Sequence, residues 1–230
     1  MVLRGFRFAL LPPRPPSSAL YEVHWPVKPV ASSTGENGDL PTSIGILNLY
    51  GSRTFASSVA SALGSAGLSC AAVSTESLGD VETLLVPLLA PSEEGAALQS
   101  EMVAKLLKVL QFMAANRQAS ACPSRLVVLT SGSEGPRSAA LTTGKAGVGF
   151  GAVWGMLRTA RIELPARFTI TCIDTDASLT SDGLHLAQQL RGELSNLDGQ
   201  FEVAYRGTVR HCRELKPSEL HLVGPGTPTP

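Results

Sequence analysis

The chain has 230 residues, of which 43% are apolar, and its 19 basic side chains balance its 19 acidic ones. This length suits one large domain or two small ones with a real core. The balanced charge gives no electrostatic reason to expect a nucleic acid or membrane partner, no apolar run is long enough to span a bilayer, and four cysteines without a C-x-x-C pair favour a cytoplasmic protein with reduced thiols.

The predicted elements alternate between strand and helix along most of the chain. Proline-rich residues 12–18 indicate an extended linker before the first strand. In chain order, the pattern then predicts strands at 20–27, 44–50, 68–74, 82–91, 125–133 and 168–174, helices at 54–67, 97–118, 150–164 and 183–194, and two short strands within 201–215 around Arg206-Gly207. Strand 82–91 is expected to stop at Pro87 and Pro91.

Short apolar strands alternating with helices predict an α/β fold with a mostly parallel sheet and helices on both faces. This is a doubly wound, Rossmann-like domain. A fold of this class does not by itself define a function.

Residues 147–165, GVGFGAVWGMLRTARIELP, match the dinucleotide-binding pattern G-x-G-x-x-G/A through Gly147, Gly149 and Ala152. A phosphate site needs its glycine turn directly after a strand, and here a long loop intervenes. The first strand-to-helix turn carries a single glycine, Gly51, and no acid follows strand 68–74 to bind a ribose. We therefore predict close helix packing at Gly147, Gly149, Gly151 and Gly155, and no cofactor binding by this chain.

The helix that follows resembles the active-site helix of short-chain dehydrogenases, K-A-A-V-x-G-L-x-R-x-L-A-x-E, because its glycine, arginine and glutamate match Gly155, Arg158 and Glu163 together. In that register Ser133 takes the serine position, Ala146 the tyrosine position and Phe150 the lysine position. Ketone reduction by this route needs a phenol to protonate the oxygen and a cation to lower its pKa. Alanine and phenylalanine supply neither, so we expect no catalytic residue in this chain.

Four motifs resemble one family over residues 20–215: LYEVHWPV, RLVVLTSGS, EVAYRGTVRHCREL and above all AVWGMLRTARIELP. Together they are similar to the structural half of the ketoreductase domain in modular polyketide synthases, which is related to animal fatty acid synthase. The resemblance implies a truncated, short-chain-dehydrogenase-like half without cofactor, next to a second half that binds NADPH and carries the catalytic tyrosine.

The resemblance also implies a division of the chain. Residues 1–19 are similar to a linker or to the end of a preceding dehydratase domain, 20–215 to the structural subdomain, and 216–230 to a flexible tail that leads toward the catalytic half. The sequence leaves open whether the chain is a fragment or a free-standing half.

Three functions remain open at this stage. The first is a scaffold that braces a catalytic half, the second an interaction module that docks an acyl carrier protein, and the third an independent nicotinamide-dependent reductase. The four histidines lack metal-ligand spacing, so no metal site is expected. Helices 97–118 and 150–164 carry more apolar residues than one stripe requires, which predicts a contact surface for the catalytic half at Met102, Leu106, Leu107, Leu110, Val153, Trp154 and Leu157.

Overall fold

The computed structural model describes residues 21–30, 41–49, 53–88, 96–116, 122–136, 150–176, 183–195 and 198–218. The predicted linker 1–19, most of the tail 216–230 and Ala146, at the tyrosine position, lie outside these ranges. The described residues fall into two units, a larger one over Trp25–Arg213 and a smaller one built around the first and last strands.

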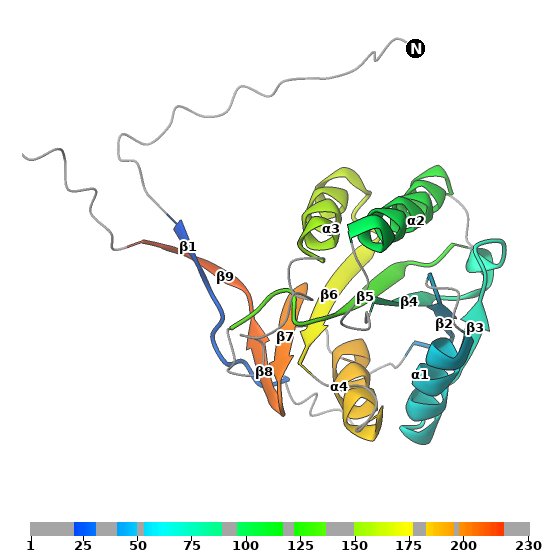
Figure 1. Ribbon diagram of the computed structural model, residues 1–230, viewed down its shortest axis with the longest axis horizontal. Coiled ribbons are helices and arrows are strands. Elements are labelled where there is room, and N and C mark those ends of the chain that lie inside the picture. Colours follow the sequence, from blue (N-terminus) through cyan, green and yellow to red (C-terminus); the bar gives the residue numbers. More distant parts are fainter. Residues whose placement is uncertain are drawn as a thin grey trace, which may run out of the picture. The chain divides into compact units, whose positions relative to one another are not determined.

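The larger unit contains a seven-stranded sheet in the order β3-β2-β4-β5-β6-β7-β8 (Figure 1). Neighbouring strands are parallel except that β8 runs antiparallel to β7. The elements are β2 (Ile44–Leu47), α1 (Arg53–Ser65), β3 (Cys70–Val73), the 3-10 turn η1 (Leu78–Asp80), β4 (Thr83–Leu88), α2 (Ala96–Ala115), β5 (Arg125–Ser131), α3 (Gly151–Glu163), β6 (Thr169–Thr175), α4 (Gly183–Ser195), β7 (Glu202–Arg206) and β8 (Val209–Cys212). The chain moves outward from β2 to β3 and then returns to β4 on the other side, which confirms the doubly wound prediction.

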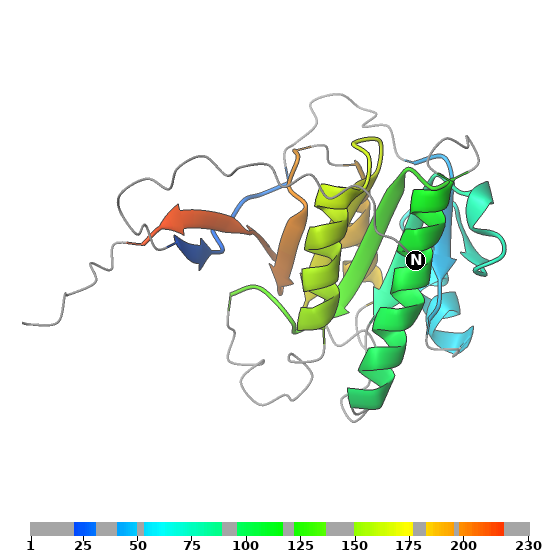
Figure 2. The same cartoon turned by 90° about the horizontal axis from the view of Figure 1, so that it is seen from above.

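Helices cover both faces of the sheet, α2 and α3 on one side and α1 and α4 on the other (Figures 1 and 2). The strands supply both cores by simple alternation: on β5, Leu126 and Val128 join the cluster under α2 and α3, whereas Val127 and Leu129 join the cluster with α1 and α4. A strand buried on both faces needs a continuous apolar run. This is why the sequence showed unbroken apolar stretches instead of a polar alternation.

Strand β4 corrects one prediction, because it runs through Pro87 and ends at Leu88. Proline lacks the N–H that a ladder requires. The N–H of Thr83 donates to the carbonyl of Ser43, so alternate residues of β4, including Pro87, direct their backbone toward β2. The ladder to β2 ends at Leu85. The missing N–H of Pro87 therefore removes no bond from the ladder to β5.

The predicted strand 20–27 is divided between the two units. Residues 25–28 belong to the larger unit and cover the outer edge of β8: the N–H of Lys28 donates to the carbonyl of Arg210 at 3.1 Å, and the N–H of Cys212 donates to the carbonyl of Pro26 at 3.1 Å. Pro26 has no N–H of its own, so it interrupts regular pairing at this point. The segment shields a sheet edge that would otherwise expose unpaired backbone groups.

The smaller unit is a two-stranded antiparallel ribbon of β1 (Tyr21–His24) and β9 (Glu214–Pro217). Within 201–215, the predicted pair is β7 and β8, whose turn places Gly207 at φ 56°. Strand β9 was not predicted as a separate element, because its partner lies at the other end of the chain and no local pattern announces that pairing.

A buried carboxylate on β7 holds α3 against the sheet. Glu202 accepts hydrogen bonds from Nε and Nη2 of Arg158, the shorter one 2.8 Å, and from Nη1 of Arg161 at 2.8 Å. Nε of Arg213 lies 3.4 Å from the same carboxylate. Burial by itself raises the pKa of Glu202, but the hydrogen bonds and charges of Arg158 and Arg161 outweigh it, so this pKa lies below its ordinary value.

Replacing this carboxylate should weaken the fold in a pH-dependent way. We expect Glu202→Gln to lower the free energy of unfolding at pH 7 by about 2–3 kcal/mol, less than for a fully buried pair because Arg158 is partly exposed. A lowered folded-state pKa gives stability above the unfolded value of about 4.3, and that stability is lost as the pH falls through the folded pKa. Urea unfolding between pH 3 and pH 7 should therefore show the difference shrinking in acid.

The matched control is Glu163→Gln, which changes an exposed glutamate on the same helix α3. It should leave stability within about 0.5 kcal/mol of the wild type. A loss for Glu202→Gln that stays constant across the pH range would contradict the role assigned to its charge.

Candidate functional site

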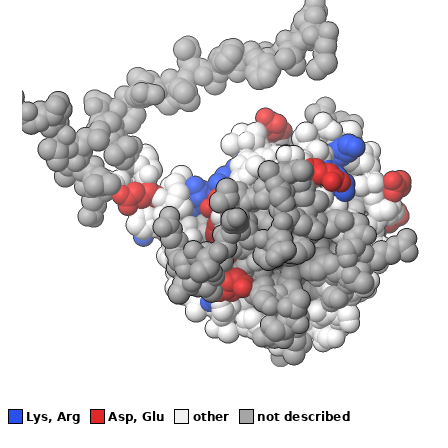
Figure 3. Space-filling view, in the orientation of Figure 1, with Lys and Arg blue, Asp and Glu red and all other residues white. Residues whose placement is uncertain are grey.

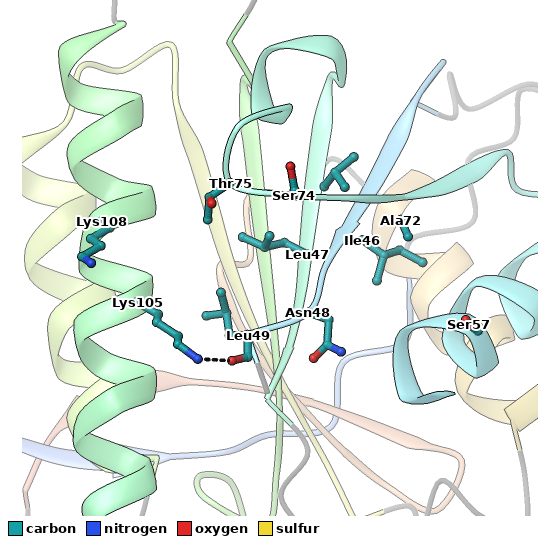
Figure 4. Close-up of a pocket in the computed structure, with 11 residues that line it drawn as sticks. Ile46, Leu47, Asn48, Leu49, Ser57, Ala72, Ser74, Thr75, Lys105 and Lys108 are labelled. Atoms are coloured by element: carbon teal, nitrogen blue, oxygen red, sulfur yellow. Dashed lines mark hydrogen bonds between the residues drawn. The ribbon is translucent and has the colours of Figure 1, made fainter. Parts of the chain in front are cut away.

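The carboxyl ends of β2 and β3 border an open pocket of about 790 Å³ beside α2 (Figure 4). It lies where the strand order reverses, the place at which doubly wound sheets bind their ligands. Its polar lining includes Asn48, Ser74, Thr75, Lys105 and Lys108.

The described lining fits a dinucleotide poorly. Nζ of Lys105 donates to the carbonyl of Leu49 at 2.8 Å and lies 2.7 Å from Oε1 of Glu101, so its charge is already paired (Figure 4). Strand β3 is followed by Ser74, whose hydroxyl lies 3.3 Å from that of Ser77. No acidic residue lines the described part of this pocket. The turn with Gly51 lies outside the described residues.

The residues at the serine, tyrosine and lysine positions of the dehydrogenase pattern, Ser133, Ala146 and Phe150, do not form a common site in the described part of the structure. Ser133 lies in the loop after β5, where its backbone N–H donates to Oδ1 of Asp174 at 2.9 Å. Phe150 directly precedes α3, and its side chain is buried in the core under α2 and α3. Ala146 lies outside the described residues, so the structure places only two of the three positions.

An internal polar network occupies the carboxyl ends of β5, β6 and β7. Asp174 on β6 is fully buried and accepts a hydrogen bond from Oγ1 of Thr130 at 2.6 Å. Thr130 in turn accepts one from Nε1 of Trp154 at 3.0 Å. Nη2 of Arg206 lies 2.9 Å from Oδ2 of Asp174. The buried carboxylate is thus satisfied by groups from β5, from the loop after β5 and from β7, and Trp154 on α3 joins the network through Thr130.

Arg206 also fixes the loop that carries Ser133. Its guanidinium donates to the carbonyl of Glu134 and, at 3.1 Å, to the carbonyl of Pro136. Gly135 stands between them at φ 113°, and a Cβ there would lie 2.5 Å from Cβ of Ala204 and 2.7 Å from Nη2 of Arg206. Only glycine fits, because both the backbone angle and the space exclude a side chain.

The ionisation of Asp174 depends on this arrangement. Burial raises the pKa of its carboxyl above the ordinary value, and the hydrogen bonds from Thr130 and Ser133 and the charge of Arg206 offset only part of that rise. The sequence places Asp174 at the end of an apolar strand but does not identify its partners. The sequence did carry one signal for this ion pair: an acid, Asp174, at the end of one buried strand and an arginine, Arg206, at the end of another.

Removing the arginine should leave a buried charge without its counter-ion. We expect Arg206→Met to lower the free energy of unfolding at pH 7 by about 3–5 kcal/mol. The variant raises the pKa of Asp174 further, so its folded state takes up a proton as the pH falls toward the unfolded value of about 3.9. Denaturant unfolding from pH 8 to pH 4.5 should show the loss diminishing with falling pH.

A second substitution tests the cause of that loss. Adding Asp174→Asn to Arg206→Met removes the unpaired charge and should recover part of the stability. Arg167→Met, at an exposed arginine, is the control and should have little effect. Equal losses for Arg206→Met and Arg167→Met would show that the buried pair is unimportant.

The structure narrows the predicted contact surface. All seven of its residues were expected to meet a partner, but six of them are at most 6% exposed and pack in the core instead: Met102, Leu106, Leu110, Val153, Trp154 and Leu157. Leu107 is 43% exposed. Helices α2 and α3 lie side by side on one face of the sheet (Figure 2), and a groove of about 430 Å³ between them is lined by Leu107, Met156, Thr159, Glu163 and Leu164, among others.

The described charged side chains form no patch of a single sign on the face drawn in Figure 3. On the face drawn in Figure 3, the described acidic and basic side chains are scattered and intermixed. Within the described ranges, no three His, Cys, Asp or Glu side chains come together in a possible metal site. No described helix is both long and apolar enough to cross a bilayer.

The sheet order and the helix placement together define a Rossmann-like domain, with an internal ion pair at the carboxyl ends of its central strands. The family can also be stated. A family model described as "Polyketide synthase extender module SpnB, Rossmann fold domain" matches residues 23–213, and the chain belongs to this family.

Solved ketoreductases share the fold. The first ketoreductase of the tylosin polyketide synthase superimposes with a TM-score of 0.59 at 18% identity, over 86% of this chain and 41% of that one. A-type ketoreductases from a modular polyketide synthase superimpose with a TM-score of 0.59 at 18% identity, over 91% of this chain and 45% of that one. A C2-type ketoreductase superimposes with a TM-score of 0.57 at 21% identity, over 87% of this chain and 44% of that one. The chain therefore spans less than half the length of each of these ketoreductases.

Proposed function

We propose that this chain is the non-catalytic half of a polyketide synthase ketoreductase, a scaffold for the half that binds NADPH and reduces β-keto acyl thioesters on an acyl carrier protein. The observation that carries the proposal is the network around Asp174. At the strand ends where a reductase would bring its reacting groups together, Thr130, Ser133 and Arg206 are bonded to that buried carboxylate. In this proposal residues 20–215 form the scaffold, and 1–19 and 216–230 connect it to its neighbours.

The alternative of an independent reductase lacks its chemistry. A ketone is reduced by hydride transfer together with a proton from an acid. The lysine position holds Phe150, which is buried in the core, and the tyrosine position holds Ala146. Neither side chain can donate a proton or stabilise a phenolate, so the reduction is assigned to the partner half.

The alternative of a carrier-protein dock requires a basic surface, since carrier proteins are acidic. Two of the arginines that could supply it, Arg206 and Arg210, are committed to internal pairs. Arg210 is 3% exposed and lies 2.5 Å from Oε1 of Glu193, and the side chain of Arg206 is 8% exposed against Asp174. Charges that are paired inside the fold present little field to a partner, which favours the scaffold.

The groove between α2 and α3 is the surface proposed for the catalytic half. Leu107 on α2 is a large apolar side chain left half-exposed at its border, and Glu163 on α3 borders it as well. A short-chain-dehydrogenase fold pairs through the equivalent helices, and an apolar knob between two helices suits a third helix packing across them.

The proposal predicts that the isolated chain does not bind NADPH. The pocket at β2 and β3 offers lysines and hydroxyls but lacks a ribose-binding acid among its described lining. Titration followed by NADPH fluorescence should give no saturable signal, whereas the catalytic half should bind. A dissociation constant for NADPH in the micromolar range or tighter for the isolated chain would contradict this prediction. If weak binding is seen, Lys105→Ala and Lys108→Ala would show whether it involves this pocket.

It also predicts that the chain binds the catalytic half added as a separate polypeptide. Leu107→Asp should weaken that association by about 1–3 kcal/mol, as expected for an interface anchor, measured by binding titration and by the shift in melting temperature. Lys108→Asp introduces the same group at an exposed position of α2 that does not line the groove, and should change little. No association of the wild-type chain would overturn the scaffold function.

A further inference from the structure

The β1–β9 ribbon has two unlike faces. Residues directly opposite each other in an antiparallel pair share a face, and the faces alternate along each strand. The register pairs Val23 with Leu215 and Tyr21 with Pro217, so one face is wholly apolar. The remaining pairs fill the other face with polar groups: Glu22 with Lys216, and His24 with Glu214.

The polar face is internally satisfied. Nε2 of His24 lies 3.6 Å from Oε2 of Glu22, and Nζ of Lys216 lies 3.8 Å from Oε2 of Glu214. The hydroxyl of Ser218 donates to Oε1 of Glu22 at 2.6 Å. These groups are compatible with contact to water and require no partner.

The apolar face, in contrast, is exposed to solvent. Tyr21 is 62% exposed, Leu215 58% and Val23 47%. A two-stranded ribbon alone is at best marginally stable in water, and exposed apolar side chains gathered on one face mark an interaction surface. Burying them against another surface would stabilise both the ribbon and the contact.

The position of the ribbon in the chain favours a partner that is joined to this domain. Strands β1 and β9 are the first and last elements of the described chain, so any segment joined to this domain at either end leaves from the ribbon. The solved ketoreductases that share the fold are more than twice as long as the matched region. A partner tethered at the ribbon would meet its apolar face at high effective concentration.

We propose that the apolar face formed by Tyr21, Val23, Leu215 and Pro217 docks the catalytic half, as a second contact surface in addition to the groove between α2 and α3. This inference rests on the proposed scaffold function. The competing occupant, a second copy of this chain, is tested in the same experiment.

The experiment titrates the full 230-residue chain with the ketoreductase catalytic half from the same gene or gene cluster, expressed separately. Val23→Asp and Leu215→Asp should each weaken the association at least tenfold. Val23→Thr keeps a β-branched side chain that suits a strand but removes apolar area, and should weaken it by roughly threefold to tenfold. Lys216→Gln, on the polar face, is the matched control and should stay within about twofold of the wild type.

The outcomes separate the two proposals. If Leu107→Asp weakens the association while Val23→Asp, Val23→Thr and Leu215→Asp do not, the scaffold function stands and the ribbon contact is wrong. If the wild-type chain does not bind the catalytic half, both the scaffold function and the ribbon contact are wrong. If the ribbon variants abolish self-association in sedimentation but leave binding to the catalytic half unchanged, the occupant is a second copy and the proposal is overturned. Amide exchange at residues 21–24 verifies that each variant keeps its ribbon.

Discussion

The fully buried carboxylate of Asp174 is the constraint around which the carboxyl edge of the sheet is built. A charge taken out of water costs several kcal/mol unless other groups replace the water. Here the replacements come from three elements: a hydroxyl from β5, a backbone N–H from the following loop and a guanidinium from β7. Satisfying one carboxylate therefore fixes the positions of two strands and of the first residues of the loop after β5, within 132–136. Trp154 extends the same network into α3.

Much of the fold followed from the sequence because the local signals agreed with the final structure. Helix 183–194 and strand 168–174 are recovered as α4 and β6 within about one residue, the usual scatter of such boundaries. Both depend on apolar periodicity, which the chain carries locally. The prediction was wrong at Pro87, because whether a proline breaks a strand depends on which neighbour its missing N–H would have faced. That direction is set by the register between strands, which no local window contains.

The site was less predictable than the fold. The sequence placed Ser133 and Phe150 in their slots, but it did not identify the pairing of Asp174 with Arg206 or of Glu202 with Arg158, whose partners lie 32 and 44 residues apart. For the predicted contact surface, periodicity indicated correctly that α2 and α3 are rich in apolar residues. It could not show that Trp154 and Leu106 are buried in the core between the sheet and the two helices. Two helices packed side by side bury wider apolar stripes than one helix alone.

The pairing of β1 with β9 has a consequence for how such a domain can be combined with others. Because Tyr21 lies opposite Pro217, the incoming and outgoing chain run side by side, about 5 Å apart. A domain with adjacent ends can be inserted into a loop of a host protein, or removed from it, without forcing the flanking segments apart. The ribbon is therefore compatible with insertion of the domain into different host chains, because the spacing that the flanking segments must bridge stays the same.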